Sequence, residues 1–151
     1  MMEKNTYIYK GYIFNDNNET YFSNSLKNKN IENLICDGEI DENVFYNIQG
    51  IKKLQIKNIS SNVLNKLIIP NTVEELTISN IFKDKCEIDL KKLKSLSNLK
   101  YLKIFNIPNL YSVILPQNLI HFESDAMIPQ TSLIFSNKLK RIIIHNNKLS
   151  I

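Results

Sequence analysis

The chain has few of the residues that build common catalytic and cofactor sites. Its 151 residues include three glycines, four prolines, two cysteines, two histidines and no tryptophan. So few glycines leave little scope for the glycine-rich loops that hold nucleotide phosphates, and no P-loop, dinucleotide fingerprint or Gly-x-Ser-x-Gly motif occurs. No nucleophile or metal-ligand spacing is evident either. We therefore expect a protein that is not an enzyme and that uses no cofactor.

The cysteines and the lengths of the apolar runs indicate in which cellular compartment the protein is expected. Cys36 and Cys86 form neither a metal-binding spacing nor a redox motif, and we expect no disulfide between them. The N-terminal residues lack the apolar stretch of a signal peptide, and no run is long enough to span a bilayer. These features predict a cytoplasmic protein without membrane contact.

The charge of the chain is modest. Nineteen Lys and Arg residues face fifteen Asp and Glu residues, for a formal charge of +4. The lysines are interspersed with acidic residues, whereas nucleic-acid binding usually needs a basic stripe. A nucleic-acid partner is therefore not expected.

What the sequence does contain is one apolar pattern that occurs six times. It reads apolar, two residues, apolar, one residue, apolar, and it recurs every 20 to 26 residues. The copies centre on Leu34, Leu54, Leu76, Leu102, Phe122 and Ile142. A unit of this length cannot bury its own apolar face, so several copies must stack around a continuous core. The pattern predicts a solenoid over residues 31–151, forming a single structural domain.

Each copy is predicted to be a short strand of a parallel sheet with about six strands. The apolar residues point inward, and the residues between them point to the opposite, solvated face. Residues 1–30 differ and predict an N-terminal β-hairpin cap, with strands within 6–14 and 19–22. In the alternative interpretation, Ile13 belongs to a degenerate extra repeat.

The longest repeat carries an additional segment. From residue 84 to 99, Ile88, Leu90, Leu93, Leu96 and Leu99 recur at roughly helical spacing, which predicts a short amphipathic helix on the outer side. We interpret the lysines among them as a solvated helix face in preference to a phosphate site. These are Lys91, Lys92 and Lys94.

The stretches 111–119 and 139–149 carry a resemblance to the leucine-rich repeat family. They are similar to its short repeats with Leu-Pro or Ile-Pro returns, as in bacterial effector, amoebal and viral proteins. The resemblance implies a β-rich α/β horseshoe with a concave parallel sheet, and a role in protein binding. The family's usual inward asparagine is replaced here by residues such as Ile59 and Ile81, and Asn58 and Asn80 come one position earlier. We therefore expect an apolar contact in place of most of the asparagine ladder.

The outward residues of the sheet form three columns, in which most charges pair across strands. Tyr101 and Phe105 interrupt this pattern, and aromatic residues dominate interface hot spots. Partner binding is therefore assigned to five residues: Tyr101, Phe105, Lys103, Glu75 and His121.

The two histidines could also belong to a metal or general-base site. Both face outward, and Asp125 should lie beside His145. We favour a surface polar pair, because no third ligand or nucleophile is evident.

These features predict a non-catalytic protein–protein interaction module that binds a protein partner on its sheet. One alternative is a structural, self-assembling protein, because the Ile142–Ile144 strand should expose an open C-terminal edge that permits weak homo-oligomers. Another is a substrate-recognition fragment of a ubiquitin-ligase-like effector.

Overall fold

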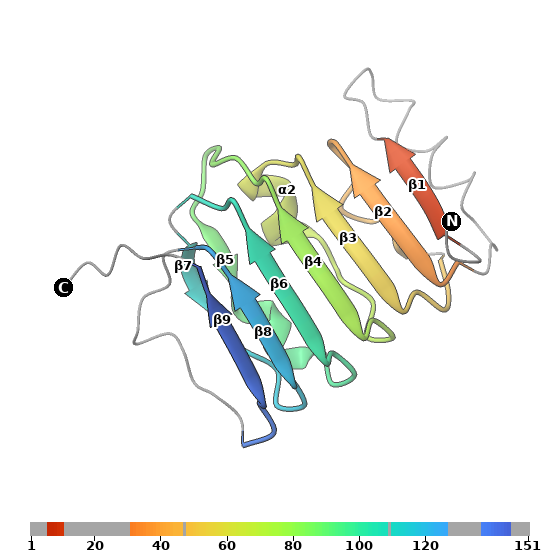
Figure 1. Cartoon of the computed structure of the whole chain (residues 1–151). Coiled ribbons are helices and arrows are strands. Elements are labelled where there is room, and N and C mark those ends of the chain that lie inside the picture. Colours follow the sequence, from red (N-terminus) through yellow and green to blue (C-terminus); the bar gives the residue numbers. More distant parts are fainter. Residues whose placement is uncertain (1–5, 11–30, 47, 109, 127–136, 146–151) are drawn as a thin grey trace.

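The structure is a computed structural model that describes residues 6–10, 31–46, 48–108, 110–126 and 137–145. The fold is β-rich and consists of stacked coils of a solenoid, each contributing one strand to a parallel sheet (Figure 1). Over the described residues, no helix has the length and apolar character needed to cross a membrane.

The main sheet has seven parallel strands in the order β1-β2-β3-β4-β6-β8-β9. Their bounds are β1 Thr6–Lys10, β2 Asn33–Asp37, β3 Lys53–Lys57, β4 Glu75–Ser79, β6 Tyr101–Phe105, β8 His121–Ser124 and β9 Arg141–Ile144. Six of these strands are the predicted repeats. Figure 1 shows all seven side by side, from β1 in red to β9 in blue.

The seventh strand, β1, falls within the segment predicted to form a hairpin cap. It pairs in parallel with β2, with Tyr7 opposite Leu34, so it extends the sheet as an additional coil would. The expected returning strand at 19–22 and Ile13 lie outside the described residues.

A second layer covers one face of the main sheet. It consists of α2 (Ser61–Lys66), β5 (Ile88–Leu90), the 3₁₀ helix η1 (Lys91–Ser95) and β7 (Leu110–Val113). β5 and β7 pair in parallel as a separate two-stranded sheet. In Figure 1, α2, β5 and β7 lie behind the main sheet. We call the opposite, uncovered face of the main sheet the open face.

The prediction of one amphipathic helix between residues 84 and 99 is wrong, because this segment forms a strand followed by a 3₁₀ helix. Its apolar residues are buried as expected, but Ile88 and Leu90 belong to a strand, and the helix is a five-residue 3₁₀ turn. Ile88 and Leu90 are two residues apart and pair with β7, which favours a strand. Leu93 and Leu96 are three residues apart, which is the period of a 3₁₀ helix.

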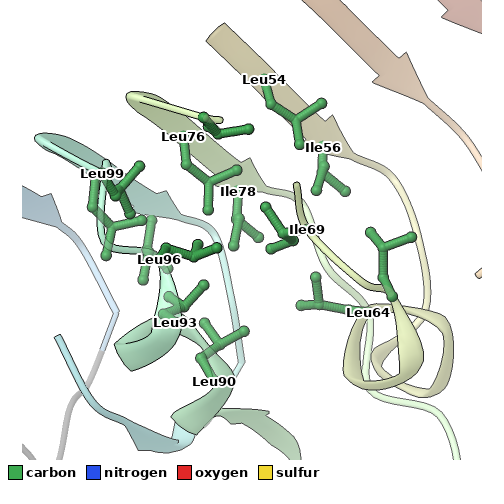
Figure 2. Packing of buried hydrophobic residues seen from close by; sticks show 14 of the residues in the cluster. Leu54, Ile56, Leu64, Ile69, Leu76, Ile78, Leu90, Leu93, Leu96 and Leu99 are labelled. Carbon is green, nitrogen blue, oxygen red and sulfur yellow. The ribbon is translucent and has the colours of Figure 1, made fainter. Parts of the chain in front are cut away.

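The core lies between the main sheet and the second layer. Leu54, Ile56, Leu76 and Ile78 are at most 1% exposed. Figure 2 shows these side chains directed toward Leu64, Leu90, Leu93 and Leu96 of the second layer. Burying one such side chain stabilises the fold by about 1.5–3 kcal/mol, so the stacking of coils supplies the main driving force.

Asparagine or glycine follows four of the strands, where the chain leaves the sheet. Asn58, Asn80 and Asn106 have φ angles of 62°, 54° and 52°, and Gly38 occupies the same position after β2 with φ 104°. Asparagine tolerates this left-handed region better than most residues with a side chain. The next residues, Ile59, Ile81 and Ile107, are buried, so the predicted apolar contact is confirmed.

Lys92 departs from the prediction of a solvated lysine face. Lys91 and Lys94 are exposed, but Lys92 is only partly exposed, and its Nζ donates to the backbone oxygens of Leu64 and Leu67 at the end of α2. Burial lowers the pKa of Lys92 to about 8. The ammonium thus joins η1 to α2, because the last carbonyls of a helix lack partners within it.

Both cysteines are free thiols, as predicted. Cys36 is fully buried at an inward position of β2, and burial raises the pKa of its thiol to about 12. Cys36 therefore packs as a small apolar residue.

Candidate functional site

The candidate site lies on the open face, at the end of the sheet that contains β6, β8 and β9. We call it the aromatic–histidine cluster. It consists of Tyr101, Phe105, His121, Glu123 and His145. Tyr101 and Phe105 come from the two ends of β6, His121 and Glu123 from β8, and His145 directly follows β9.

The strand register brings these residues together, and it confirms the predicted columns. Tyr101 pairs with His121, and His121 with Arg141. Lys103 pairs with Glu123, and Glu123 with Ile143. The intervening inward residues Leu102, Ile104 and Phe122 are fully buried, which sets the direction of their outward neighbours.

Glu123 lies at the centre of the cluster, between the two histidines. Its Oε1 is 2.8 Å from His145 Nε2, and its Oε2 is 3.4 Å from His121 Nε2. The side chains of Glu123 and His121 are 18% and 14% exposed, whereas that of His145 is 50% exposed. One carboxylate therefore has a different imidazole at each of its oxygens.

Each histidine also contacts an aromatic ring of β6. The ring centroids of Tyr101 and His121 are 6.2 Å apart, and the two ring planes are tilted by 43°. Those of Phe105 and His145 are 6.1 Å apart, and the ring planes are tilted by 41°. Tyr101 is exposed and Phe105 is partly buried, so the Tyr101 ring beside His121 is more accessible to a partner than the Phe105 ring beside His145.

The electrostatic environment favours the ionised form of Glu123. Its pKa is lowered, mainly by the hydrogen bond from His145, with further contributions from His121 and from the positive charges of Lys103 and His145. Desolvation acts in the opposite direction but does not prevail. Glu123 is thus a carboxylate across the physiological pH range.

The structure brings most of the predicted binding residues to this cluster. Tyr101, Phe105 and His121 belong to it, and Lys103 lies between the two rings on β6. Glu75 is next to Tyr101 in the ladder, but its Oε2 is 4.0 Å from Lys53 Nζ, so Glu75 belongs to a separate ion pair.

Two members of the cluster, Glu123 and His145, were absent from the predicted set of binding residues. The register that pairs Ser124 with Ile144 brings Asp125 beside His145, as expected, but Asp125 Oδ1 accepts a hydrogen bond from the backbone N–H of Asn106 at 2.8 Å. The His145 ring contacts Glu123 instead. A signal for this existed in the sequence, because both histidines and Glu123 occupy outward positions of neighbouring strands.

The cluster provides apolar ring surface, one carboxylate and two imidazoles in a compact area. Among the described residues, no three histidine, cysteine or acidic side chains are arranged to hold a metal ion. These groups can contact a partner through aromatic surface and through charge.

Comparisons with models of protein families, with curated proteins and with solved structures find no match to this chain.

Proposed function

We propose that the chain is a non-catalytic protein-interaction module of the leucine-rich repeat type, which binds a partner protein at the aromatic–histidine cluster. One observation carries the proposal. Tyr101 and Phe105 occupy the outward face of β6, whereas Leu102 and Ile104 on the same strand already fill the core. Tyr101 is thus 41% exposed although the core is closed beneath it.

The mode of binding follows from the rigidity of the surface. The strands on both sides of β6 hold its backbone, and the inward side chains are packed. A preformed surface loses little conformational entropy when a partner binds, and aromatic side chains supply large contact areas. Lys103, Glu75 and His121 around the rings would set the charge pattern that selects the partner.

The cellular setting belongs to the same proposal. Cys36 and Cys86 are unpaired, which fits a reducing compartment such as the cytoplasm.

The test compares protein capture by matched variants. The double variant Tyr101→Ala/Phe105→Ala should lose partners that wild-type protein retains from a native lysate, as identified by mass spectrometry. Tyr111→Ala is the matched control, because Tyr111 is 60% exposed but belongs to β7 in the second layer. It should capture the same partners as wild type.

Thermal unfolding of the three proteins completes this test. The double variant should melt close to wild type, since the two rings lie outside the core. Equal capture by all three proteins would contradict the proposal. Unfolding of the double variant would instead assign the rings a structural role.

A second candidate function is self-assembly, which a feature of β9 favours. Ile142 and Ile144 occupy inward positions but are 44% and 47% exposed, unlike the inward residues of β2 to β8. In the part of the chain that the structure describes, β9 pairs with β8 alone. Open strand edges permit pairing with a second copy. Sedimentation velocity at several concentrations should then detect weak dimers that Ile142→Lys removes, and a concentration-independent monomer would refute this candidate.

A further inference from the structure

The chain contains two histidines, and both lie at the same carboxylate. His121 and His145 are distant in the sequence, yet each places Nε2 next to a different oxygen of Glu123. Histidine is the side chain whose charge ordinarily changes between about pH 5 and pH 8. Side-chain charge changes in that pH range are therefore concentrated at this one place on the open face.

Protonation of both histidines inverts the charge of this group. When both imidazoles are neutral, the two histidines and Glu123 together carry one negative charge. When both are protonated, they carry one positive charge, because Glu123 remains ionised in its hydrogen bonds.

The other charges around the group are balanced. Lys103 on β6 and Arg141 on β9 are positive, and Asp125 after β8 is negative and bonded to a backbone N–H. Together with Glu123, these residues sum to zero while the histidines are neutral. The same surface carries a net charge of +2 once both histidines are protonated.

We propose that the aromatic–histidine cluster is a proton-switched docking surface for an acidic segment of a partner protein. The proposal rests on the proposed function, which it deepens by naming the chemistry of the partner and the condition that strengthens binding. Protonation adds positive charge beside Tyr101 and beside Phe105, where a bound segment would contact the rings. An acidic chain would thus find charge complementarity and aromatic contact at the same place.

An acidic peptide fits this surface better than a nucleic acid does. Nucleic-acid sites carry a continuous basic stripe that follows the phosphates. Here the open face alternates in sign, with Asp37 on β2, Glu75 on β4 and Asp125 beyond β8 among the cations. The positive charge that protonation adds is confined to the two histidines of the cluster, which suits a short acidic segment.

The experiment measures binding of a fluorescent hexa-aspartate peptide by anisotropy, at constant ionic strength, at about pH 7.5 and about pH 5.5, on either side of ordinary histidine titration. Wild-type protein should bind about three- to tenfold more tightly at the lower pH, because each added surface ion pair contributes modestly. The double variant His121→Asn/His145→Asn should lose this difference. Lys94→Gln, which removes a cation from η1 in the second layer, should keep it.

Glu123→Gln tests the charge balance from the opposite direction. Glu123 is ionised at both pH values, so removing its negative charge should tighten peptide binding at both, while the difference between the two pH values persists. Melting curves at both pH values establish that each variant is folded, and His145→Asn alone serves as a second variant if the double variant unfolds. His145 is half exposed, so its replacement disturbs little packing.

Three results would overturn the inference. One is wild-type affinity that changes by less than about twofold between the two pH values, which is below the smallest effect expected of two exposed ion pairs. Another is a pH dependence that persists in the histidine variants. The third is tighter binding of a thymidine hexanucleotide than of hexa-aspartate at both pH values.

The proposed function and this inference can fail separately. If Tyr101→Ala/Phe105→Ala captures every wild-type partner, the proposed function fails. If capture requires the rings but peptide binding does not respond to pH through the histidines, only the proton switch fails.

Discussion

His145 Nε2 lies 2.8 Å from Glu123 Oε1, a contact that joins the residue after β9 to the neighbouring strand β8. The backbone supports the same junction, because His145 N donates to Ser124 O at 2.9 Å. The side-chain contact depends on ionisation, whereas the backbone contact does not. The contribution of Glu123 to the free energy of unfolding can therefore be measured by varying the pH, which leaves the backbone contact unchanged.

Glu123→Gln should change the acid stability of the protein. The pKa of Glu123 is lowered in the folded state, so its ionised form stabilises the fold above the ordinary glutamate pKa of about 4.3. This contribution is lost as the pH falls below that value and through the lower pKa of the folded state. Urea unfolding at successive pH values should show wild type and Glu123→Gln converging in acid. A constant gap between them would contradict the assignment.

Lys92→Met should reveal a pH dependence of the same sign, but in the alkaline range. The pKa of Lys92 is lowered from 10.5 to about 8 by burial. Between those values the unfolded chain holds the proton and the folded chain does not, so stability rises with pH in that window. Wild type should therefore gain stability relative to Lys92→Met as the pH rises from about 8 to about 10.5, measured by urea unfolding. Parallel curves would mean that Lys92 titrates as an exposed lysine.

Leu54→Ala and Leu102→Ala should each lower the free energy of unfolding by about 2–5 kcal/mol, because they leave a cavity between the sheet and the second layer. Both side chains are at most 1% exposed. Lys53→Ala, on the open face beside Leu54, should cost less than about 1 kcal/mol. Chemical denaturation measures all three. Equal losses at Lys53 and Leu54 would contradict the assignment of the two faces.

Asn80→Ala should destabilise the protein more than Asn80→Gly does. Asn80 has a φ of 54°, and alanine pays about 1–2 kcal/mol in that region, whereas glycine enters it freely. Both variants lose the hydrogen bond that Asn106 Nδ2 donates to Asn80 Oδ1 at 2.7 Å. The difference between the variants thus isolates the backbone effect. Equal unfolding free energies would show that backbone conformation is not what asparagine supplies here.

Much of the main sheet could be predicted from the apolar pattern. Leu34, Leu54, Leu76 and Leu102 stand opposite one another along β2, β3, β4 and β6, as their places in the repeat indicate. The prediction succeeded because a shift by one residue would turn a whole set of apolar side chains toward water.

The additional segment of the longest repeat was predicted less well. Its apolar residues were assigned to the core correctly, but the period was interpreted as helical, while Ile88 and Leu90 pair with β7. For short apolar runs, strand and helix share similar spacings, and the choice depends on a distant partner strand. Lys92 shows the same dependence, because its acceptors at Leu64 and Leu67 belong to another coil.

The sequence by itself determined the spacing of six repeats, their register and the direction of each strand residue, because burial of every second side chain admits one arrangement. It also placed Tyr101, Phe105 and both histidines on the open face. It did not reveal that β1 adds a seventh parallel strand. Only the tertiary structure decided that Glu123 lies between His121 and His145, while Asp125 bonds to the backbone. Outward side chains reach diagonal as well as direct neighbours on a sheet. Which contact forms therefore depends on hydrogen bonds, charges and rings from three strands at once, and no single repeat contains that information.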